Sequence, residues 1–425
     1  MISLLAVALW LAPCQAGAVD PAADLSGLGS KSPAAFQLRN LTQGPGEAGS
    51  FQAVSALPIR LPAPPPAVIK LPAGVEPAAA KLSEYFSDET DIKTELVQAV
   101  DSSKKTIEAA LFGITLTEVA EALVRARDRG VAVRVVMNQN HVFPQRTRSK
   151  EVQFLMDKGI DMRTARGNRS YGVQHNKICV FDGKLLKTGS FNWTFSANNY
   201  NYENAIFTTE PGYVAGFSDY WRWMWDRSRP VTSGPVGEFP ENHFTGAPPC
   251  KATVSFNGVA LPACAFSPQG QTEAHLIRAI QASRDAINVA SYSFYSQNLA
   301  DALVAARDRG LKVRVLVDKE MGKKSQITRF FLDKGIAVRW LSGRGKGSMH
   351  HKYAVFDGKL LETGSHNWTN NAELNDFENA LLTAKASTVG AYTRKFEELY
   401  GRAAVPTIEQ LPAPEKVEGS AAAAE

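Results

Sequence analysis

The segment HNKICVFDGKLLKTGSFNWT at residues 175–194 recurs without a gap as HHKYAVFDGKLLETGSHNWT at residues 350–369. Both copies keep the spacing His-x-Lys-x4-Asp-x6-Gly-Ser-x-Asn. Each copy is typical of a strand, a tight Asp-Gly turn and a second strand. Because residues two apart on a strand share a face, we expect the first His and the Lys of each copy to project together.

The repeat extends far beyond these segments. EALVRARDRGVAVRVVMN at 121–138 corresponds to DALVAARDRGLKVRVLVD at 301–318. In each half, helix-periodic segments alternate with Val-rich strands, which favours an α/β fold with an at least partly parallel sheet. We therefore expect two similar domains at 81–232 and 254–404, joined by a linker at 233–253.

Each half ends in a segment with aromatic residues at helical spacing, which predicts a core-facing helix. The stripes comprise Phe217, Trp221 and Trp225 in the first half and Tyr392, Phe396 and Tyr400 in the second. Trp223 lies off its stripe, which is compatible with a place at a domain or membrane interface.

The two ends of the chain differ from this pattern. The apolar run ISLLAVALWLA is followed by the small-x-small site Ala16-Gly17-Ala18, which predicts a signal peptide at 1–18 and export to the periplasm or cell exterior. Residues 19–80 are rich in Ala and Pro and indicate a linker, and 405–425 indicates a flexible tail. The formal net charge of +5 favours an anionic substrate or surface but is modest for a dedicated nucleic-acid binder.

Cysteine usage agrees with export. Cys250 and Cys264 bracket a hairpin-like segment and would form a disulfide in an oxidising compartment, with two free thiols as the alternative. Cys179 lies in an apolar run and is expected in the core. No His or Cys spacing suits zinc, so we expect neither a metal nor a cofactor.

The repeated segment carries its own chemical logic. A protonated His would repel the Lys beside it, and an anionic ligand between them removes that conflict. Ser and Asn add neutral donors of the kind that cradle phosphate oxygens. Gly189 and Gly364 are expected to let the backbone approach the ligand closely. Two imidazoles suit metal-free phosphoryl transfer, in which one attacks phosphorus and the other protonates the leaving oxygen.

The motif resembles the HKD signature of the phospholipase D superfamily over nearly all of 82–403. The TGSxNWT form and the later ENA are most similar to the branch with endonuclease-like members and the mitochondrial cardiolipin hydrolase. The resemblance implies two αβα sandwich domains about a pseudo-twofold axis, with the active site at their interface. Because both half-sites lie in one chain, it also implies a monomer.

The resemblance implies roles for individual residues. His175 and His350 would be nucleophile and general acid, with His175 taken as the nucleophile. The phosphate would be held by Lys177, Ser190, Asn192, Lys352, Ser365 and Asn367. Glu203 and Glu378 would each orient a His. Asp182 and Asp357 would brace the fold.

Other polar residues around the motif have weaker assignments. His351 should point to the opposite face in a structural role, and His366 is placed beside the cleft. The equivalent loop residues Arg169 and Arg344 could border the cleft together with Arg166 and Lys346 and attract a polyanion, or could be solvated loop charges.

Three functions compete. The first is an exported, metal-independent phospholipase D-type hydrolase that acts at a membrane surface and forms phosphatidic acid through a phosphohistidine. The second is an endonuclease that cleaves DNA or RNA by the same two-His mechanism. The third, a non-catalytic binding or toxin-like module, is disfavoured because both motifs are intact.

Overall fold

The structure is a computed structural model that describes residues 81–144 and 147–411. The expected signal peptide, the Ala/Pro-rich linker and most of the expected tail lie outside these residues. The described residues belong to one compact unit.

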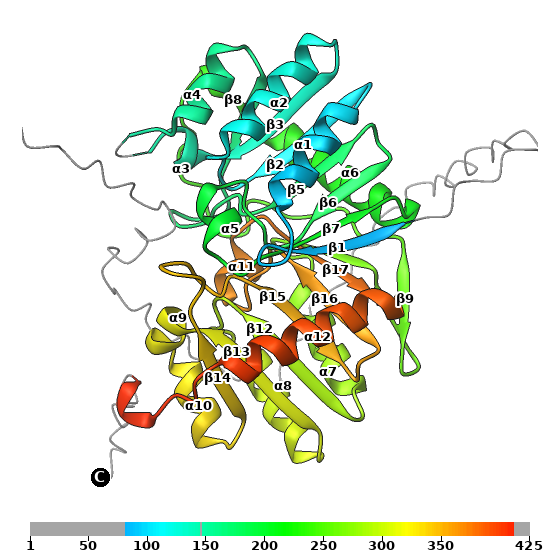
Figure 1. Cartoon of the computed structure of the whole chain (residues 1–425), viewed down its shortest axis with the longest axis vertical. Helices are drawn as coiled ribbons and strands as arrows, with labels where there is room; N and C mark the ends of the chain where they lie inside the picture. Colours follow the sequence, from blue (N-terminus) through cyan, green and yellow to red (C-terminus); the bar gives the residue numbers. More distant parts are fainter. Residues whose placement is uncertain (1–80, 145–146, 412–425) are drawn as a thin grey trace, which may run out of the picture. The chain divides into compact units, whose positions relative to one another are not determined.

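The first half is built on an eight-stranded mixed sheet (Figure 1). Its strands, in spatial order, are β1 (Leu82–Phe86), β7 (Asn204–Thr208), β6 (Leu185–Thr188), β5 (Lys177–Phe181), β2 (Thr106–Leu111), β3 (Ala132–Asn138), β4 (Asp161–Ala165) and β8 (Arg229–Pro230). Strands β2, β3 and β4 pair in parallel, and the β2–β5, β5–β6, β6–β7 and β1–β7 pairs are antiparallel. The expected partly parallel sheet is confirmed.

The second half repeats this topology in a seven-stranded sheet. Its strands, in spatial order, are β11 (Cys264–Ser267), β17 (Glu378–Thr383), β16 (Leu360–Gly364), β15 (Lys352–Phe356), β12 (Ala286–Ser291), β13 (Lys312–Asp318) and β14 (Ala337–Leu341). The pairings match those of the first half, with β12, β13 and β14 parallel. Strands that are equivalent in the two repeats therefore occupy equivalent positions in the two sheets.

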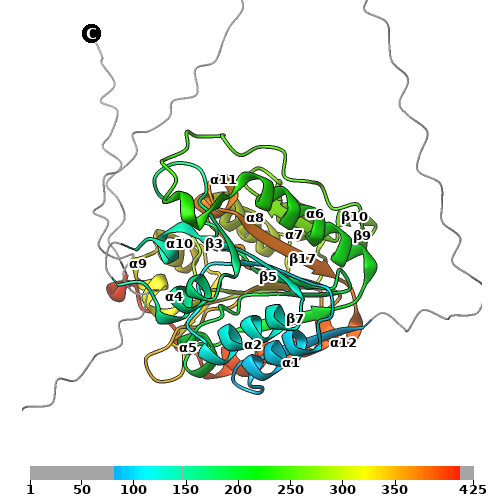
Figure 2. The same cartoon turned by 90° about the horizontal axis from the view of Figure 1, so that it is seen from above.

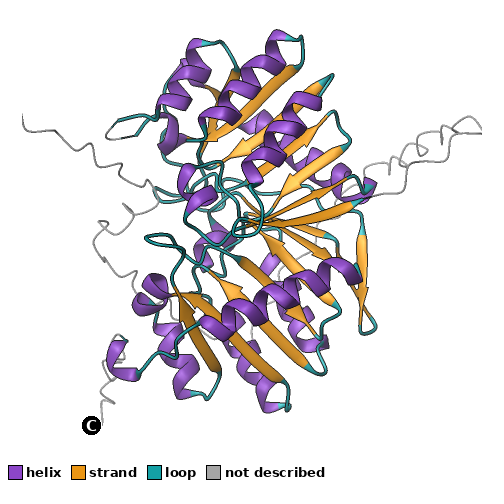
Figure 3. Cartoon of the chain, in the orientation of Figure 1, coloured by secondary structure: helices purple, strands orange, loops and turns teal. Residues whose placement is uncertain are grey.

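Helices flank both sheets (Figure 3). The first half contains α1 (Ile92–Ser102), α2 (Thr117–Asp128), α3 (Gln139–Val142), α4 (Lys150–Asp157), α5 (Phe195–Asn199), α6 (Pro211–Arg227) and the 3-10 turn η2 (Val231–Ser233). The second contains α7 (Thr272–Ala282), α8 (Gln297–Asp308), α9 (Lys319–Lys324), α10 (Gln326–Asp333), α11 (Asn370–Leu374), α12 (Ala386–Arg402) and η3 (Ile408–Gln410). No helix within the described part of the chain is both long and apolar enough to cross a membrane.

Three apolar cores result, and strand β5 shows why. Ile178 and Val180 point into a central core that both halves share, whereas Cys179 and Phe181 point into the outer core under α1 and α2. A sheet covered on both faces needs apolar residues at successive positions, and β5 is buried along its whole length. The second half has an equivalent outer core of its own.

The aromatic helices α6 and α12 fill the shared core. Both predicted stripes are buried. Trp223 is buried too, and its ring packs edge-on against Phe377 of the other half with ring centroids 5.6 Å apart. The sequence leaves a domain interface or a membrane interface open for Trp223, and in the structure Trp223 lies at the interface between the two domains.

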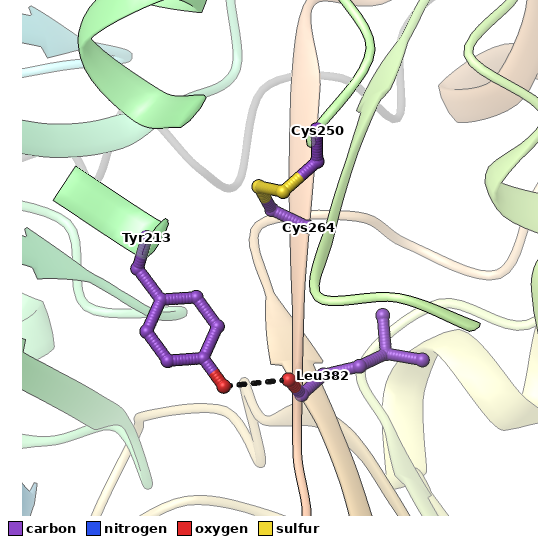
Figure 4. The surroundings of a disulfide bond; sticks show 4 residues. All are labelled: Tyr213, Cys250, Cys264 and Leu382. Atoms are coloured by element: carbon purple, nitrogen blue, oxygen red, sulfur yellow. Dashed lines mark hydrogen bonds between the residues drawn. A yellow bond between two sulfur atoms is a disulfide. The ribbon is translucent and has the colours of Figure 1, made fainter. Parts of the chain in front are cut away.

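A hairpin and a disulfide anchor the segment between the halves. Strands β9 (Thr253–Phe256) and β10 (Val259–Pro262) form the expected hairpin, and Cys250 is bonded to Cys264 across it. Close by, Tyr213 of α6 donates a hydrogen bond to the carbonyl of Leu382 in β17 at 2.9 Å (Figure 4). The linker is thus fixed where α6 of the first half meets the second sheet.

Candidate active site

In each repeated segment, the backbone of the first His is hydrogen-bonded to the opposite half of the chain. His175 and His350 each lie two residues before a central strand, β5 or β15. The His175 N–H donates to the carbonyl of Phe377, and the His350 N–H donates to that of Tyr202, each at 3.0 Å. The position of each His therefore depends on a segment from the opposite half.

Two imidazole–carboxylate pairs cross between the halves. Nδ1 of His175 lies 2.7 Å from Oε1 of Glu378, and Nδ1 of His350 lies 2.8 Å from Oε1 of Glu203. Both carboxyl groups are fully buried. A carboxylate at Nδ1 favours the tautomer with its proton there, which leaves Nε2 for chemistry. The expectation that each Glu orients a His fits this geometry, and the structure adds that the partners come from different halves.

The two pairs differ in detail. The His175–Glu378 contact has the alignment of a hydrogen bond, whereas Nδ1 of His350 is close to Glu203 without that alignment. Nε2 of His350 instead lies 3.1 Å from Nζ of Lys352. Nε2 of His175 has no such neighbour among the described residues. The imidazole of His175 is therefore hydrogen-bonded to Glu378 through Nδ1, whereas the imidazole of His350 contacts Lys352 through Nε2.

Burial governs the charge of both imidazoles. It lowers the pKa of His175 to about 4, although Glu378 acts in the opposite direction. Burial lowers the pKa of His350 well below its ordinary value, and the charges of Lys352 and Lys177 lower it further. Because Lys177 acts on His350 and Lys352 acts on His175, the groups of both halves lie within electrostatic reach of one another.

The two carboxyl groups respond differently to burial. Burial raises the pKa of Glu203 to about 7, against the opposing effect of Lys352. Burial acts in the same direction on Glu378, but the attraction and hydrogen bond of His175 outweigh it and leave the pKa below its ordinary value. Glu378 is thus the carboxylate that stays ionised beside its His.

Each lysine is folded back toward its own His. Lys177 Nζ donates to the carbonyl of His175, and Lys352 Nζ donates to that of His350 at 2.9 Å. Burial lowers the pKa of Lys177 well below its ordinary value and that of Lys352 to about 8. Two buried ammonium groups beside two imidazoles form a site that a bound anion would stabilise.

The serine and asparagine of each motif occupy different surroundings. Oγ of Ser190 accepts a hydrogen bond from the backbone N–H of Asn204, and Oγ of Ser365 accepts one from that of Asn379, each at 3.0 Å. Both serines are fully buried. The side-chain oxygens of Asn192 and Asn367 are also buried, yet they have no hydrogen-bond partner among the described residues. The unused hydrogen-bonding capacity is therefore on the acceptor oxygens of these two asparagine amides.

The geometry can be compared with known families at this point. Residues 96–225 and 276–400 both match the family described as "Cardiolipin synthase, PLD-like domain". The chain belongs to this PLD-like family. Each match contains one complete repeated segment, so the crossed pairs join two PLD-like domains.

Relatives of the PLD-like domains share part of their length with this chain. The human protein named "Mitochondrial cardiolipin hydrolase" is 33% identical over 157 residues, which cover 36% of this chain and 61% of that protein. The Rickettsia prowazekii protein named "Phospholipase D" is 28% identical over 162 residues, which cover 38% of this chain and 73% of that protein. The chain thus matches about three fifths of the length of the human relative.

One solved structure aligns with both PLD-like domains. The phosphatidylserine synthase of Haemophilus influenzae matches 75% of this chain and 85% of its own, with a TM-score of 0.61 and 14% identity. At that identity the likeness concerns the fold. It confirms the expected arrangement of two similar α/β domains.

The aspartates of the PLD-like motif lie at the far ends of their strands. Asp182 accepts hydrogen bonds from the backbone N–H groups of Lys104, Lys105 and Thr106 at 2.7–3.1 Å. Asp357 does the same for residues 284–286. Both join the turn of the motif to the start of a neighbouring strand, which agrees with a bracing role.

The motif glycines serve a different purpose from the one expected. A Cβ on Gly189 would lie 2.5 Å from the carbonyl oxygen of Asn204, and one on Gly364 would lie 2.1 Å from that of Asn379. In the structure these glycines admit the adjacent strand, where the residue before Asn204 or Asn379 is the glutamate that contacts a His. The expectation that they also let the backbone approach a ligand stays a prediction.

His351 and His366 lie behind the motif. His351 is fully buried, and its Nδ1 is 3.0 Å from Nδ2 of Asn204 in the other half. This position on the opposite face matches the expectation. His366 is 1% exposed and lies 3.4 Å from Glu373, an attraction that raises its pKa despite burial. His366 is thus a buried residue, and its expected place beside a cleft stays a prediction.

Two aromatic residues belong to the site but escaped the sequence analysis. The ring of Phe112 packs edge-on against His175, with centroids 4.8 Å apart, and Tyr292 packs against His350 at 4.5 Å. Lys177 and Lys352 lie over the same two rings. Phe112 and Tyr292 directly follow the equivalent strands β2 and β12. An aromatic residue at the same place in both repeats could have indicated a role at the site.

Proposed function

We propose that this chain is a metal-independent phosphodiesterase of the phospholipase D type that hydrolyses the distal phosphodiester of phospholipids. The observation that carries the proposal is the pair of crossed His–Glu contacts, His175 with Glu378 and His350 with Glu203. They leave two imidazole Nε2 atoms and two ammonium groups in one site. Such a set suits a phosphodiester in which one imidazole attacks phosphorus and the other protonates the leaving oxygen.

The first chemical step is assigned to His175. Its Nε2 lone pair attacks phosphorus, an N–P bond forms, and the P–O bond to the headgroup alcohol breaks. His350 in its protonated form gives the Nε2 proton to the leaving oxygen. The aligned Nδ1 contact of His175 with Glu378 supports it as the nucleophile, because it fixes the tautomer and leaves Nε2 unprotonated.

The second step regenerates the enzyme. A water molecule gives a proton to His350 and attacks phosphorus, the N–P bond breaks, and phosphatidic acid leaves. Lys177 and Lys352 offset negative charge on the five-coordinate phosphorus, and the amides of Asn192 and Asn367 donate to its oxygens. A bound anion also favours the protonated form of His350, which burial otherwise disfavours.

The names of the relatives support a lipid substrate, since cardiolipin and a phospholipase both occur in them. We propose export and action as a monomer on the grounds given by the sequence. An endonuclease that cleaves DNA or RNA is the second candidate. The observation that favours it is a set of loop cations, Arg166, Arg344 and Lys346, which have no carboxylate partner in the part of the chain that the structure describes.

A burst experiment tests the assignment. The activated diester bis(p-nitrophenyl) phosphate needs no acid for its leaving group, so His350→Ala should release one equivalent of p-nitrophenol and accumulate phosphohistidine. His175→Ala should release none. A burst from His175→Ala and none from His350→Ala would reverse the roles, and activity abolished by EDTA would contradict metal independence. Turnover of phosphatidylcholine or of single-stranded DNA then separates the two substrates.

A further inference from the structure

Two rims border the candidate site, and each is made from both halves. The first rim consists of residues 166–174 with 370–377, and the second of residues 342–349 with 194–202. In the first rim, the N–H of Asn168 donates to Asn375 and that of Phe377 donates to Val173, both at 2.9 Å. In the second, the N–H of Tyr202 donates to Ser348 at 2.9 Å. Each rim leads directly into one His, 175 or 350.

The rims carry exposed hydrophobic side chains. Six large hydrophobic residues are exposed in the described part of the chain, and three of them lie on the rims. Tyr171 (49% exposed) and Leu374 (46%) belong to the first rim, and Phe195 (54%) belongs to the second. Single exposed hydrophobic residues are ordinary, but here the equivalent helices α5 and α11 each expose one, Phe195 at the start of α5 and Leu374 at the end of α11. Leu374 and Phe195 lie on the short helices α11 and α5, which Figure 2 shows well apart from each other.

The same rims carry positive charge without matching carboxylates. The guanidinium of Arg166 donates to the carbonyls of Arg169 and Ser170, and that of Arg344 donates to those of Asn198 and Asn201. Lys346 is exposed and lies 5.9 Å from the ring centroid of Tyr200. Within the described ranges, Arg166, Arg344 and Lys346 form no ion pair. Arg169 differs, because it pairs with Glu241.

We propose that the two rims form an interfacial docking surface that places the candidate site against a bilayer containing anionic phospholipid. Phe195, Leu374 and Tyr171 enter the boundary between headgroups and acyl chains, and Arg166, Arg344 and Lys346 contact the phosphates. This combination of hydrophobic and basic groups is what interfacial attachment requires. The inference rests on the function proposed above, since it places both His Nε2 atoms toward the lipid headgroups.

The composition of the rims favours a membrane over a nucleic acid. Aromatic rings and basic groups also fit a single strand, on which bases would stack. Leu374, however, offers no face for a base to stack on, whereas acyl chains would cover it. Three unpaired cations are few for a polyanion whose affinity depends on many phosphate contacts.

Co-sedimentation with vesicles tests the surface separately from catalysis. All variants are made in a His175→Ala background, so that the lipid is not consumed. Binding to vesicles of mixed phosphatidylcholine and phosphatidylglycerol should fall about tenfold for Phe195→Ser and for Leu374→Ser. Lys346→Ser should lower it about fivefold on these vesicles and leave it unchanged on pure phosphatidylcholine.

Two exposed residues away from the rims provide matched controls. Ile408 is 43% exposed on η3, and Lys312 is exposed at the opposite end of β13 from the site. Ile408→Ser and Lys312→Ser should bind vesicles like the background chain. A melting temperature within a few degrees of the background shows that each variant is folded.

The outcomes separate this inference from the proposed function. If the unmodified chain hydrolyses bis(p-nitrophenyl) phosphate but rim variants and controls bind vesicles equally, the docking surface is wrong and the proposed function stands. If rim variants lose binding to single-stranded RNA while vesicle binding is unaltered, the rims are a nucleic-acid surface and the inference is overturned. If no diester is hydrolysed at all, the proposed function itself fails.

Discussion

Nδ1 of His175 lies 2.7 Å from Oε1 of Glu378, although 203 residues separate them in the chain. The contact joins a residue just before β5 to the first residue of β17 in the other half. The imidazole of His175 is thus positioned by a carboxylate from the other half of the chain. The predictions below begin from this contact.

Replacing the carboxylate should disable the nucleophile more than the acid. Glu378→Gln presents an amide that can stabilise the wrong tautomer of His175, and we expect kcat to fall about 10²- to 10⁴-fold with little change in KM. Glu203→Gln should leave the p-nitrophenol burst intact and slow the later turnover. Stopped-flow assays measure both phases, and equal loss of the burst in the two variants would contradict the assignment.

The acid limb of the pH profile should lie unusually low. Burial lowers the pKa of His175 to about 4, so the neutral form persists well below pH 6 in the free enzyme. We expect kcat/KM on an activated diester to decline only as the pH approaches 4. Since Glu378 stabilises the protonated imidazole, Glu378→Gln should move this limb lower still. A limb near the ordinary histidine value of about 6.5 would show that the site is more hydrated than the structure indicates.

Lys187 should make the fold less stable at neutral pH than at high pH. It is fully buried, donates to the carbonyls of Lys177 and Phe191, and burial lowers its pKa to about 7. The unfolded chain binds this proton up to about pH 10.5, so the stability contribution of Lys187 falls as the pH drops from 10.5 to 7, by about 1.4 kcal/mol per unit.

Lys187→Met should remove this dependence. Urea unfolding at pH 7 and pH 9.5 measures it, with exposed Lys312→Met as the control. The free energy of unfolding of Lys187→Met relative to the unmodified chain should be higher at pH 7 than at pH 9.5. A constant difference across the two pH values would contradict the assignment.

Asp182 should matter for stability rather than chemistry. Its carboxylate accepts from three successive backbone N–H groups, and Asp182→Ala should cost about 1–3 kcal/mol of unfolding free energy. These hydrogen bonds lower the pKa of Asp182 despite burial, so the contribution is present above about pH 4 and is lost as the pH falls further. Denaturant titrations at pH 7 and pH 3 check this, with exposed Asp161→Ala as the control. A large loss of kcat in folded Asp182→Ala would refute the bracing role.

The sequence predicted the parts of the site that local pattern determines. The His strands, the Asp-Gly turns, the aromatic helices and the two-half organisation all follow from periodicity and repetition. The crossing of the pairs does not, because Glu203 and Glu378 occupy equivalent positions and either could serve either His. Only the packing of one half on the other decides it.

The rims escaped prediction for a different reason. Helices α5 and α11 are five residues long and lie in polar segments. They are capped by Thr194 and Thr369, whose side chains accept hydrogen bonds from the backbone N–H three residues on. Such short helices have too few turns for apolar periodicity to appear. The edge strands β1 and β11 are similarly short, and they form because β7 and β17 offer them a partner.

The equivalent buried positions 187 and 362 hold a lysine in one half and a glutamate in the other. In an assembly of two identical chains, a single substitution would appear on both sides of the site at once. One continuous chain removes that restriction, because each copy of the motif can accept mutations on its own. The two histidines can therefore specialise, one for bond formation and one for proton transfer, and the lysine in one copy and the glutamate in the other show that the two motifs have already diverged at a buried position.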